Sequence, residues 1–179
     1  GAVTQLYKNY CTDNLPDANL TESQKAYLVD LTGVAFDDVN RTLDDVANPT
    51  VTWVGKSLIL DSKVTLKFVF DASAYTGDPT ALTLRVTYVN LEGETVTETL
   101  TNPELYNASL NYYSYEFSSL RAAEIRTVLS AAVYANGEQV SPTLQYSMDT
   151  YGNNKTGTLG ALCKALFAYS DSARAFFAN

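Results

Sequence analysis

The sequence predicts a mainly β protein, an antiparallel immunoglobulin-like β-sandwich with a short helical flank before it and a longer helical flank after it. Two observations predict the sandwich: short segments alternate apolar and polar residues, and turn residues separate them every ten residues or so, roughly. An apolar stripe near the C-terminus predicts the final helix. We therefore divide the chain into a helical or irregular flank at 1–48, a sandwich at 49–152, and a helix at 153–179 that packs on the domain as one structural unit.

The N-terminal flank contains the first expected helix. Thr21 with Gln24 three positions later is the pattern of a capping box, in which these side chains satisfy free N–H groups at a helix start. The segment ESQKAYLVDL follows at once and supplies a short helix, which Gly33 ends.

The first strands of the sandwich are expected after Pro49. SLIL at 57–60 is the first convincing strand, and Trp53, which precedes it, is expected to fill the core or its boundary. KVTLKFVF at 63–70 and ALTLRVTYV at 81–89 place every second apolar side chain on one face, which is the pattern of a half-buried strand.

The following segments are expected to extend the antiparallel sheets. A turn at Glu92–Gly93 leads into ETVTETL at 94–100, where alternating Thr and Glu are typical of an edge strand that faces water. YYSYEF at 112–117 places its second and third tyrosines and its phenylalanine on one face. Asn136–Gly137 supplies the two residues with positive φ that a tight hairpin needs, and Pro142 in the second arm predicts an edge or a bulge.

The segment LGALCKALFAYSDSARAFFAN at 159–179 predicts an amphipathic helix. Its apolar residues recur at helical spacing and form one stripe: Leu159, Leu162, Cys163, Leu166, Tyr169, Ala173, Phe176 and Phe177. A helix of about five turns is marginal alone in water, so we expect the stripe to be buried. It should pack on one face of the sandwich or on the N-terminal flank, with the two terminal phenylalanines packed rather than forming a binding tail.

The composition suits a soluble globular domain and excludes several partners. Of the 179 residues, 46% are hydrophobic and 18% are charged, which is enough apolar material for a core. Twenty acidic residues against twelve basic ones give a net charge of −8, which repels a phosphate backbone, so no nucleic acid is expected as a partner. No stretch approaches the roughly 20 consecutive apolar residues of a membrane span, so no membrane insertion is expected.

Two cysteines lie near the two ends of the sequence, Cys11 and Cys163. A single bridge between them is one possibility. Two free structural cysteines are the other, which we favour because Cys163 lies on the apolar face of the final helix. The sequence begins with Gly1 rather than Met and shows no signal peptide, and we expect it to be a piece of a longer protein.

The residue types that mark most enzyme classes are missing. There is no histidine, which excludes Ser-His-Asp and Cys-His sites and histidine-containing zinc sites. A glycosidase needs only two carboxylates across a cleft, but the acidic residues here occur singly on expected solvent faces. We therefore predict that the protein is not an enzyme and has no catalytic residue and no cofactor.

One acidic segment offers oxygen ligands of the kind that Ca²⁺ prefers. FDDVNRTLDD at 36–45 contains the following oxygen-bearing side chains: Asp37, Asp38, Asn40, Asp44 and Asp45. Their spacing fits no EF-hand loop. We interpret the segment as a solvated acidic linker and predict no metal site, while the sequence leaves Ca²⁺ binding open.

The tyrosines, thirteen in all, supply candidate binding residues. Tyr112 points away from the expected core face of its strand, and Tyr75 and Tyr106 fall in nearby loops. Exposed aromatic rings with polar tips stack on sugars and contact protein partners. Tyr112, Tyr75 and Tyr106 are therefore the candidate ligand-binding residues.

Most of the chain resembles an uncharacterised family. The blocks VLSAAVYANGEQVSPTLQYSMDTYG and LCKALFAYSDSARAFF, with NYCTDNLPDANLTESQKA and VTWVGKSLILDSKVTLKFVF upstream, resemble an Ig-like β-sandwich module with a C-terminal helix. Such modules are found in long secreted or surface proteins of gut Gram-positive bacteria. The family commonly has Tyr-Gly where this chain has Tyr169–Ser170. The resemblance implies an extracellular or cell-surface location but no activity.

Two functions follow as expectations. The first is a non-catalytic extracellular module, serving as a spacer, adhesion or display unit of a larger bacterial protein. Its partners would be the other domains of that parent protein, and possible further partners are glycans or a host or cell-surface protein. The alternative is a carbohydrate-binding module that uses exposed tyrosines.

Overall fold

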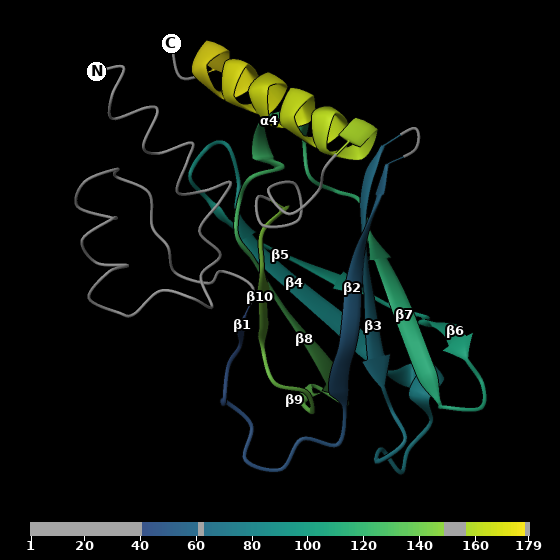
Figure 1. Ribbon diagram of the computed structural model, residues 1–179. Helices are drawn as coiled ribbons and strands as arrows, with labels where there is room; N and C mark the ends of the chain where they lie inside the picture. The colour runs from purple at the N-terminus through teal and green to yellow at the C-terminus, as the bar shows by residue number, and fades with distance from the viewer. Residues whose placement is uncertain (1–40, 61–62, 149–156, 178–179) are drawn as a thin grey trace, which may run out of the picture.

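The computed structural model describes residues 41–60, 63–148 and 157–177 of the chain. The expected helix after Thr21, and Cys11 with it, lie outside the described residues. Within the described part the fold is mainly β, with two antiparallel sheets and one C-terminal α-helix (Figure 1). The predicted β-sandwich is therefore confirmed.

The first sheet has the strand order β1-β10-β8-β4-β5, and the short β9 also pairs with β8. Its strands are β1 (Arg41–Thr42), β4 (Thr83–Val89), β5 (Thr95–Leu100), β8 (Leu129–Ala135), β9 (Glu138–Gln139) and β10 (Leu144–Tyr146). The Thr- and Glu-rich β5 lies at an edge, as its sequence predicts.

The second sheet has the order β2-β3-β7-β6. Its strands are β2 (Thr52–Leu60), β3 (Val64–Asp71), β6 (Glu104–Asn107) and β7 (Tyr112–Phe117). The strand β2 begins well before SLIL and contains Trp53, which corrects the expected start. The register of β2 against β3 shifts between Trp53 and Gly55, and this bulge interrupts the alternation that marks a strand in sequence.

The core lies between the two sheets and consists of the side chains that alternate inward. The large residues with almost no exposure are Leu66, Phe68, Phe70, Leu82, Leu84, Val86, Phe117, Leu129, Val133 and Tyr146. Trp53 packs against this core from the boundary, and its indole N–H donates to the carbonyl oxygen of Pro142 at 2.7 Å. The inward alternation predicted for β4 is confirmed, whereas β3 is buried on both faces because Thr65 and Val69 are buried as well as Leu66, Phe68 and Phe70.

Two turns have the backbone that their residues predict. Asn136 and Gly137 have φ values of 51° and 83°, which join β8 to β9 in the tight hairpin conformation. Gly93 has φ of 80° in the turn between β4 and β5.

The N–H groups of Val140 and Ser141 both point to the carbonyl oxygen of Val133, at 2.9 and 3.4 Å. Val140 and Ser141 thus lie opposite the single residue Val133 of β8, which is a β-bulge. It lies directly before Pro142, where the sequence predicts an edge or a bulge.

The helix α4 (Gly157–Phe177) lies across one end of the sandwich and contacts the short 3-10 helix η3 (Ala122–Glu124) (Figure 1). Its buried residues are small: Gly160, Cys163 and Ser170. Cys163 is 1% exposed and is a free cysteine.

The sandwich covers only one side of the apolar stripe of α4. Leu162, Tyr169, Phe176 and Phe177 are 46%, 61%, 77% and 66% exposed, whereas Leu166 and Phe167 are half-buried. The expectation that the terminal phenylalanines pack on a face of the sandwich is therefore wrong. The physical reason is that the buried residues of α4 are small, with Leu166 and Phe167 packed against the core beside them, whereas the four exposed side chains lie elsewhere on the helix.

Candidate functional site

The strand directions divide the sandwich into an α4 end and an opposite end, which we call the distal end. The strand β7 runs from Tyr112 to Phe117 toward η3, which contacts α4, so Tyr112 lies at the distal end. Because β3 is antiparallel to β7, Asp71 lies there too, paired with Tyr112. The loops at 72–82 and 108–111 and the turn at Asn136–Gly137 thus belong to the distal end (Figure 1).

The distal end carries three large exposed side chains in and after the edge strand β6. Leu105, Tyr106 and Leu110 are 57%, 56% and 50% exposed, and we call them the distal patch. The pairing of β6 with β7 shifts between Leu105 and Asn107, so Tyr106 occupies the bulged position. The patch therefore presents apolar side chains on an edge strand, where a partner can reach them.

The loop after β6 is held in a tight conformation. The side-chain oxygen of Asn107 accepts hydrogen bonds from the Leu110 N–H at 3.2 Å and from the Ser109 hydroxyl at 2.8 Å. Asn111 has a positive φ of 57°, a value that Asn tolerates better than most residues, and its carbonyl oxygen accepts from the Ala72 N–H at 3.1 Å. These contacts fix the position of Leu110 beside β6.

The structure brings the three candidate tyrosines to the same end but exposes only one of them. Tyr106 belongs to the distal patch. Tyr112 is half-buried in the ladder between β3 and β6, and Tyr75 is half-buried against the core. The Tyr75 ring also lies over Gly77, where an added Cβ would approach the Tyr75 hydroxyl to 2.5 Å. Tyr75 and Tyr112 therefore present less of their rings to a ligand than Tyr106 does.

Sequence reasoning missed a shallow hollow on the outer face of the first sheet. Its volume is about 250 Å³, and it is lined by Arg85, Thr87, Thr97, Ser130, Ala131, Ala132, Tyr134 and Thr143. The hydroxyls of Thr87 and Thr97 lie 2.9 Å apart across β4 and β5. The small side chains of Ser130 and Ala132 leave the space, because their neighbours on the adjacent strands are larger.

Arg85 and Tyr134 form one wall of this hollow. The guanidinium carbon of Arg85 lies 3.9 Å from the centroid of the Tyr134 ring, which is a cation–π contact. Among the described residues no carboxylate pairs with Arg85, so its N–H groups are available to an acceptor. Hydroxyl groups, a guanidinium and an aromatic ring are the groups that bind the polar edges and apolar faces of sugars.

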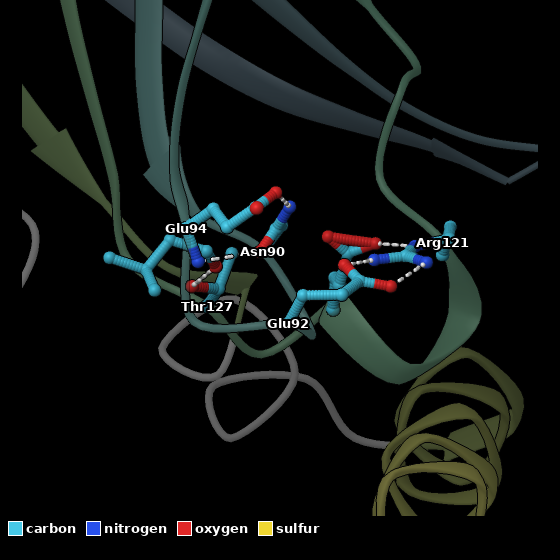
Figure 2. A network of polar contacts seen from close by, with 7 residues as sticks. Asn90, Glu92, Glu94, Arg121 and Thr127 are labelled. Atoms are coloured by element: carbon cyan, nitrogen blue, oxygen red, sulfur yellow. Dashed lines mark hydrogen bonds and ion pairs between the residues drawn. The ribbon is translucent and has the colours of Figure 1, made fainter. Parts of the chain in front are cut away.

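A polar network at the α4 end surrounds the one buried carboxylate of the described residues (Figure 2). Glu124 is 1% exposed, and the Nε of Arg121 donates to it. Arg121 also donates from Nη1 to Glu92 at 2.8 Å, so one guanidinium joins η3 to the β4–β5 turn. The hydrogen bond from Arg121 lowers the pKa of Glu92, and bonds to Glu92 and Glu124 raise the pKa of Arg121.

The surrounding bonds indicate a structural role for this network. In the same turn the Glu94 N–H donates to the side-chain oxygen of Asn90 at 2.8 Å, and the Thr127 hydroxyl donates to the Val89 carbonyl oxygen at 3.2 Å (Figure 2). These bonds connect the ends of β4, β5 and β8 beneath α4. The Glu124 carboxylate accepts a hydrogen bond from Arg121, and η3, which contains Glu124, contacts α4. Glu124 therefore helps to position the part of the sandwich on which α4 packs.

One described carboxylate of the acidic segment at 36–45, that of Asp45, is hydrogen-bonded to the sandwich. Asp45 accepts hydrogen bonds from the Thr143 N–H at 2.9 Å, from the Thr143 hydroxyl at 2.5 Å and from the Gln139 amide at 3.2 Å. Burial raises the pKa of Asp45, but these bonds lower it by more, so that its pKa lies below the usual value. Asp37, Asp38 and Asn40 lie outside the described residues.

In the part of the chain that the structure describes, no group of three or more Asp, Glu or Cys side chains is placed to hold a metal ion. None of the helices in that part has the length and apolarity to cross a membrane. No family model matches the sequence, and no curated protein matches it either.

Proposed function

We propose that this chain is a non-catalytic extracellular module of a larger bacterial protein and serves as an adhesion or display unit. The observation that carries the proposal is the placement of the distal patch at the end opposite α4. The chain enters the described part at Arg41, which pairs with Gln145 near the end of β10, and it leaves through α4. Both ends of the described part therefore lie on the side of the sandwich opposite the distal patch.

This arrangement favours adhesion or display over a plain spacer. A plain spacer needs no exposed apolar contact surface, whereas the distal end carries one. Leu105, Tyr106 and Leu110 offer apolar and aromatic contact area at that end. Aromatic residues in such surfaces supply much of the binding energy of protein contacts. The resemblance to modules of secreted and surface proteins supports the extracellular location.

Saturable binding is the experiment that tests this proposal. The labelled chain is titrated onto immobilised mucin, as a glycoprotein surface, and onto immobilised serum albumin as a matched protein surface without glycans. Saturable binding to mucin above the albumin background supports an adhesion unit. Hydrolase or transferase turnover by the isolated chain would overturn the non-catalytic assignment.

The second candidate function is carbohydrate binding, which the hollow beside Arg85 and Tyr134 favours more than the three tyrosines do. On a glycan array, a module that uses the hollow loses binding when Tyr134 is changed to Ala and keeps it when Tyr112 is changed to Ala. The reverse pattern would place the site at the tyrosines of the distal end. An array without saturable binding to any glycan would remove this candidate.

A further inference from the structure

Four of the large exposed apolar side chains of the described residues lie on α4. Leu162, Tyr169 and Phe176 are spaced by seven residues, so they form a row along one side of the helix, and Phe177 adjoins it. Phe176 and Phe177 contact each other edge to face, with ring centroids 5.4 Å apart. A seven-residue apolar row is the pattern along which a second helix packs.

We propose that the row is covered by the N-terminal flank of the same chain, through the segment at 22–31. This segment is the short helix that the Thr21 capping box predicts. In a helix, Tyr27, Leu28 and Leu31 lie on one side, while Ala26 lies on another. The segment therefore has an apolar face of its own that needs a partner, and the row on α4 matches it.

The position at which the flank joins the sandwich places it next to α4. Because β1 is antiparallel to β10, the chain before Arg41 leaves the sheet beside Tyr146, the α4 end of β10. Ser147, the next residue, donates to the carbonyl oxygen of Arg126 at 3.3 Å, and Arg126 donates to Asp171 in α4 at 2.7 Å. The point at which the flank meets the sheet is thus connected to Asp171 of α4 through the end of β10, Ser147 and Arg126.

The length of chain between the two elements is sufficient. Residues 32–40 connect the segment to Arg41, and nine residues span at most about 30 Å. The 21 residues of α4 extend over about 31 Å. Every part of the exposed row therefore lies within reach of the segment.

The charges favour the flank over a second copy of α4. Residues 1–40 contain six acidic and two basic residues. The helix α4 carries Lys164 and Arg174 against the single acidic residue Asp171, which pairs with Arg126. Two copies of α4 would bring like charges together, whereas the flank brings opposite charges to the helix.

Hydroxyl-radical footprinting of the full chain tests this proposal with an internal reference. Tyr169 and Tyr106 are the same residue type and have similar exposure on the described surface, 61% and 56%. If the flank covers α4, Tyr169 is labelled several-fold more slowly than Tyr106. Equal labelling rates in the wild-type chain would overturn the proposal, whatever the behaviour of any variant.

Two matched variants identify the covering segment. Leu28→Asp places a charge on the apolar face and should raise the labelling rate of Tyr169 to that of Tyr106. Ala26→Asp introduces the same charge on the other side of the helix and should leave Tyr169 protected. Protection that persists in Leu28→Asp would assign the cover to another part of the chain and overturn the proposal. Protection that appears only as the protein concentration rises, together with a dimer in sedimentation velocity, would assign it to a second copy and overturn it too.

Discussion

The Nη1 of Arg126 donates to the Oδ2 of Asp171 at 2.7 Å, and the same guanidinium carbon lies 5.4 Å from the centroid of the Phe167 ring. Both partners belong to α4, whereas Arg126 follows η3 in the sandwich. One side chain therefore holds the helix by an ion pair and by a cation–π contact. Since Ser147 bonds to the Arg126 carbonyl oxygen, the end of β10 joins the same contact.

Replacing Arg126 should loosen α4 without unfolding the sandwich. Arg126→Met removes both contacts, each of which is partly exposed, and we expect a loss of about 1 kcal/mol in the stability of the docked helix. Native-state hydrogen exchange would then be faster for amides in α4 and unchanged for amides in β3. Lys63→Met, at an exposed position near the start of β3, is the control and should change neither set. Equal acceleration in α4 and β3 would show that the helix unfolds only with the whole domain.

Removing Arg121 and removing the charge of Glu124 should have unequal effects on stability, because Glu124 is buried and Arg121 is half exposed. Arg121→Ala leaves Glu124 charged and buried without its partner, whereas Glu124→Gln leaves Arg121 where water can solvate it. We expect Arg121→Ala to reduce the free energy of unfolding more than Glu124→Gln, which should cost about 1 kcal/mol. Urea denaturation of both variants measures the order. The opposite order would contradict the dependence of the buried Glu124 on Arg121.

The hairpin between β8 and β9 favours glycine at position 137 because of its backbone conformation and not because space for a side chain is lacking. Gly137 has φ of 83°, and an added Cβ would meet no atom within 4 Å, so Gly137→Ala introduces backbone strain without a steric clash. We expect a cost of about 1 kcal/mol. Gly55→Ala is the control, because a Cβ there also meets open space and no positive φ is required. Thermal unfolding should show a lower Tm for Gly137→Ala and no decrease for Gly55→Ala; equal Tm values would contradict the assigned turn.

The hydrogen bonds to Asp45 predict a pH-dependent contribution to stability. Its pKa is lowered in the folded state from the ordinary value of 3.8, so the stabilisation is present above that pH and is lost as the pH falls through the folded pKa. Asp45→Ala should cost about 1 kcal/mol at pH 7, and the difference from wild type should shrink below about pH 4. The neighbouring exposed Asp44→Ala should show little effect at either pH. A difference for Asp45→Ala that is constant down to pH 2, roughly, would assign the effect to something other than the carboxylate charge.

Local sequence patterns predicted the elements whose residues determine their own backbone. Asn136–Gly137 favours a tight hairpin between two strands, and the alternation in β4 is uninterrupted. The start of β2 could not be found in the same way, because the bulge between Trp53 and Gly55 leaves Val54 45% exposed and interrupts the pattern.

The face of α4 that packs on the sandwich was wrongly predicted because large apolar residues were taken to mark it, while burial of the stripe by the N-terminal flank stays a prediction. The helix instead contacts the sandwich through Cys163 and Ser170, whose small side chains allow close approach. Tyr106 was predicted as a candidate, but Leu105 was missed because its exposure depends on the irregular pairing of β6, and Leu110 because it depends on the loop that Asn107 holds. The hollow at Arg85 and Tyr134 depends on the register of three strands, which no local pattern contains.

The measurement that tests the central proposal most directly is the affinity for immobilised mucin of a distal variant and a matched control. Tyr106→Ser removes the central ring of the distal patch, and Val89→Ser removes an apolar side chain of similar exposure, 50%, at the α4 end of β4. We predict a Kd about tenfold higher for Tyr106→Ser, as expected when a contact aromatic is lost, and an unchanged Kd for Val89→Ser. Equal Kd values for the two variants, in chains that melt like the wild type, would contradict the assignment of the distal end as the binding surface.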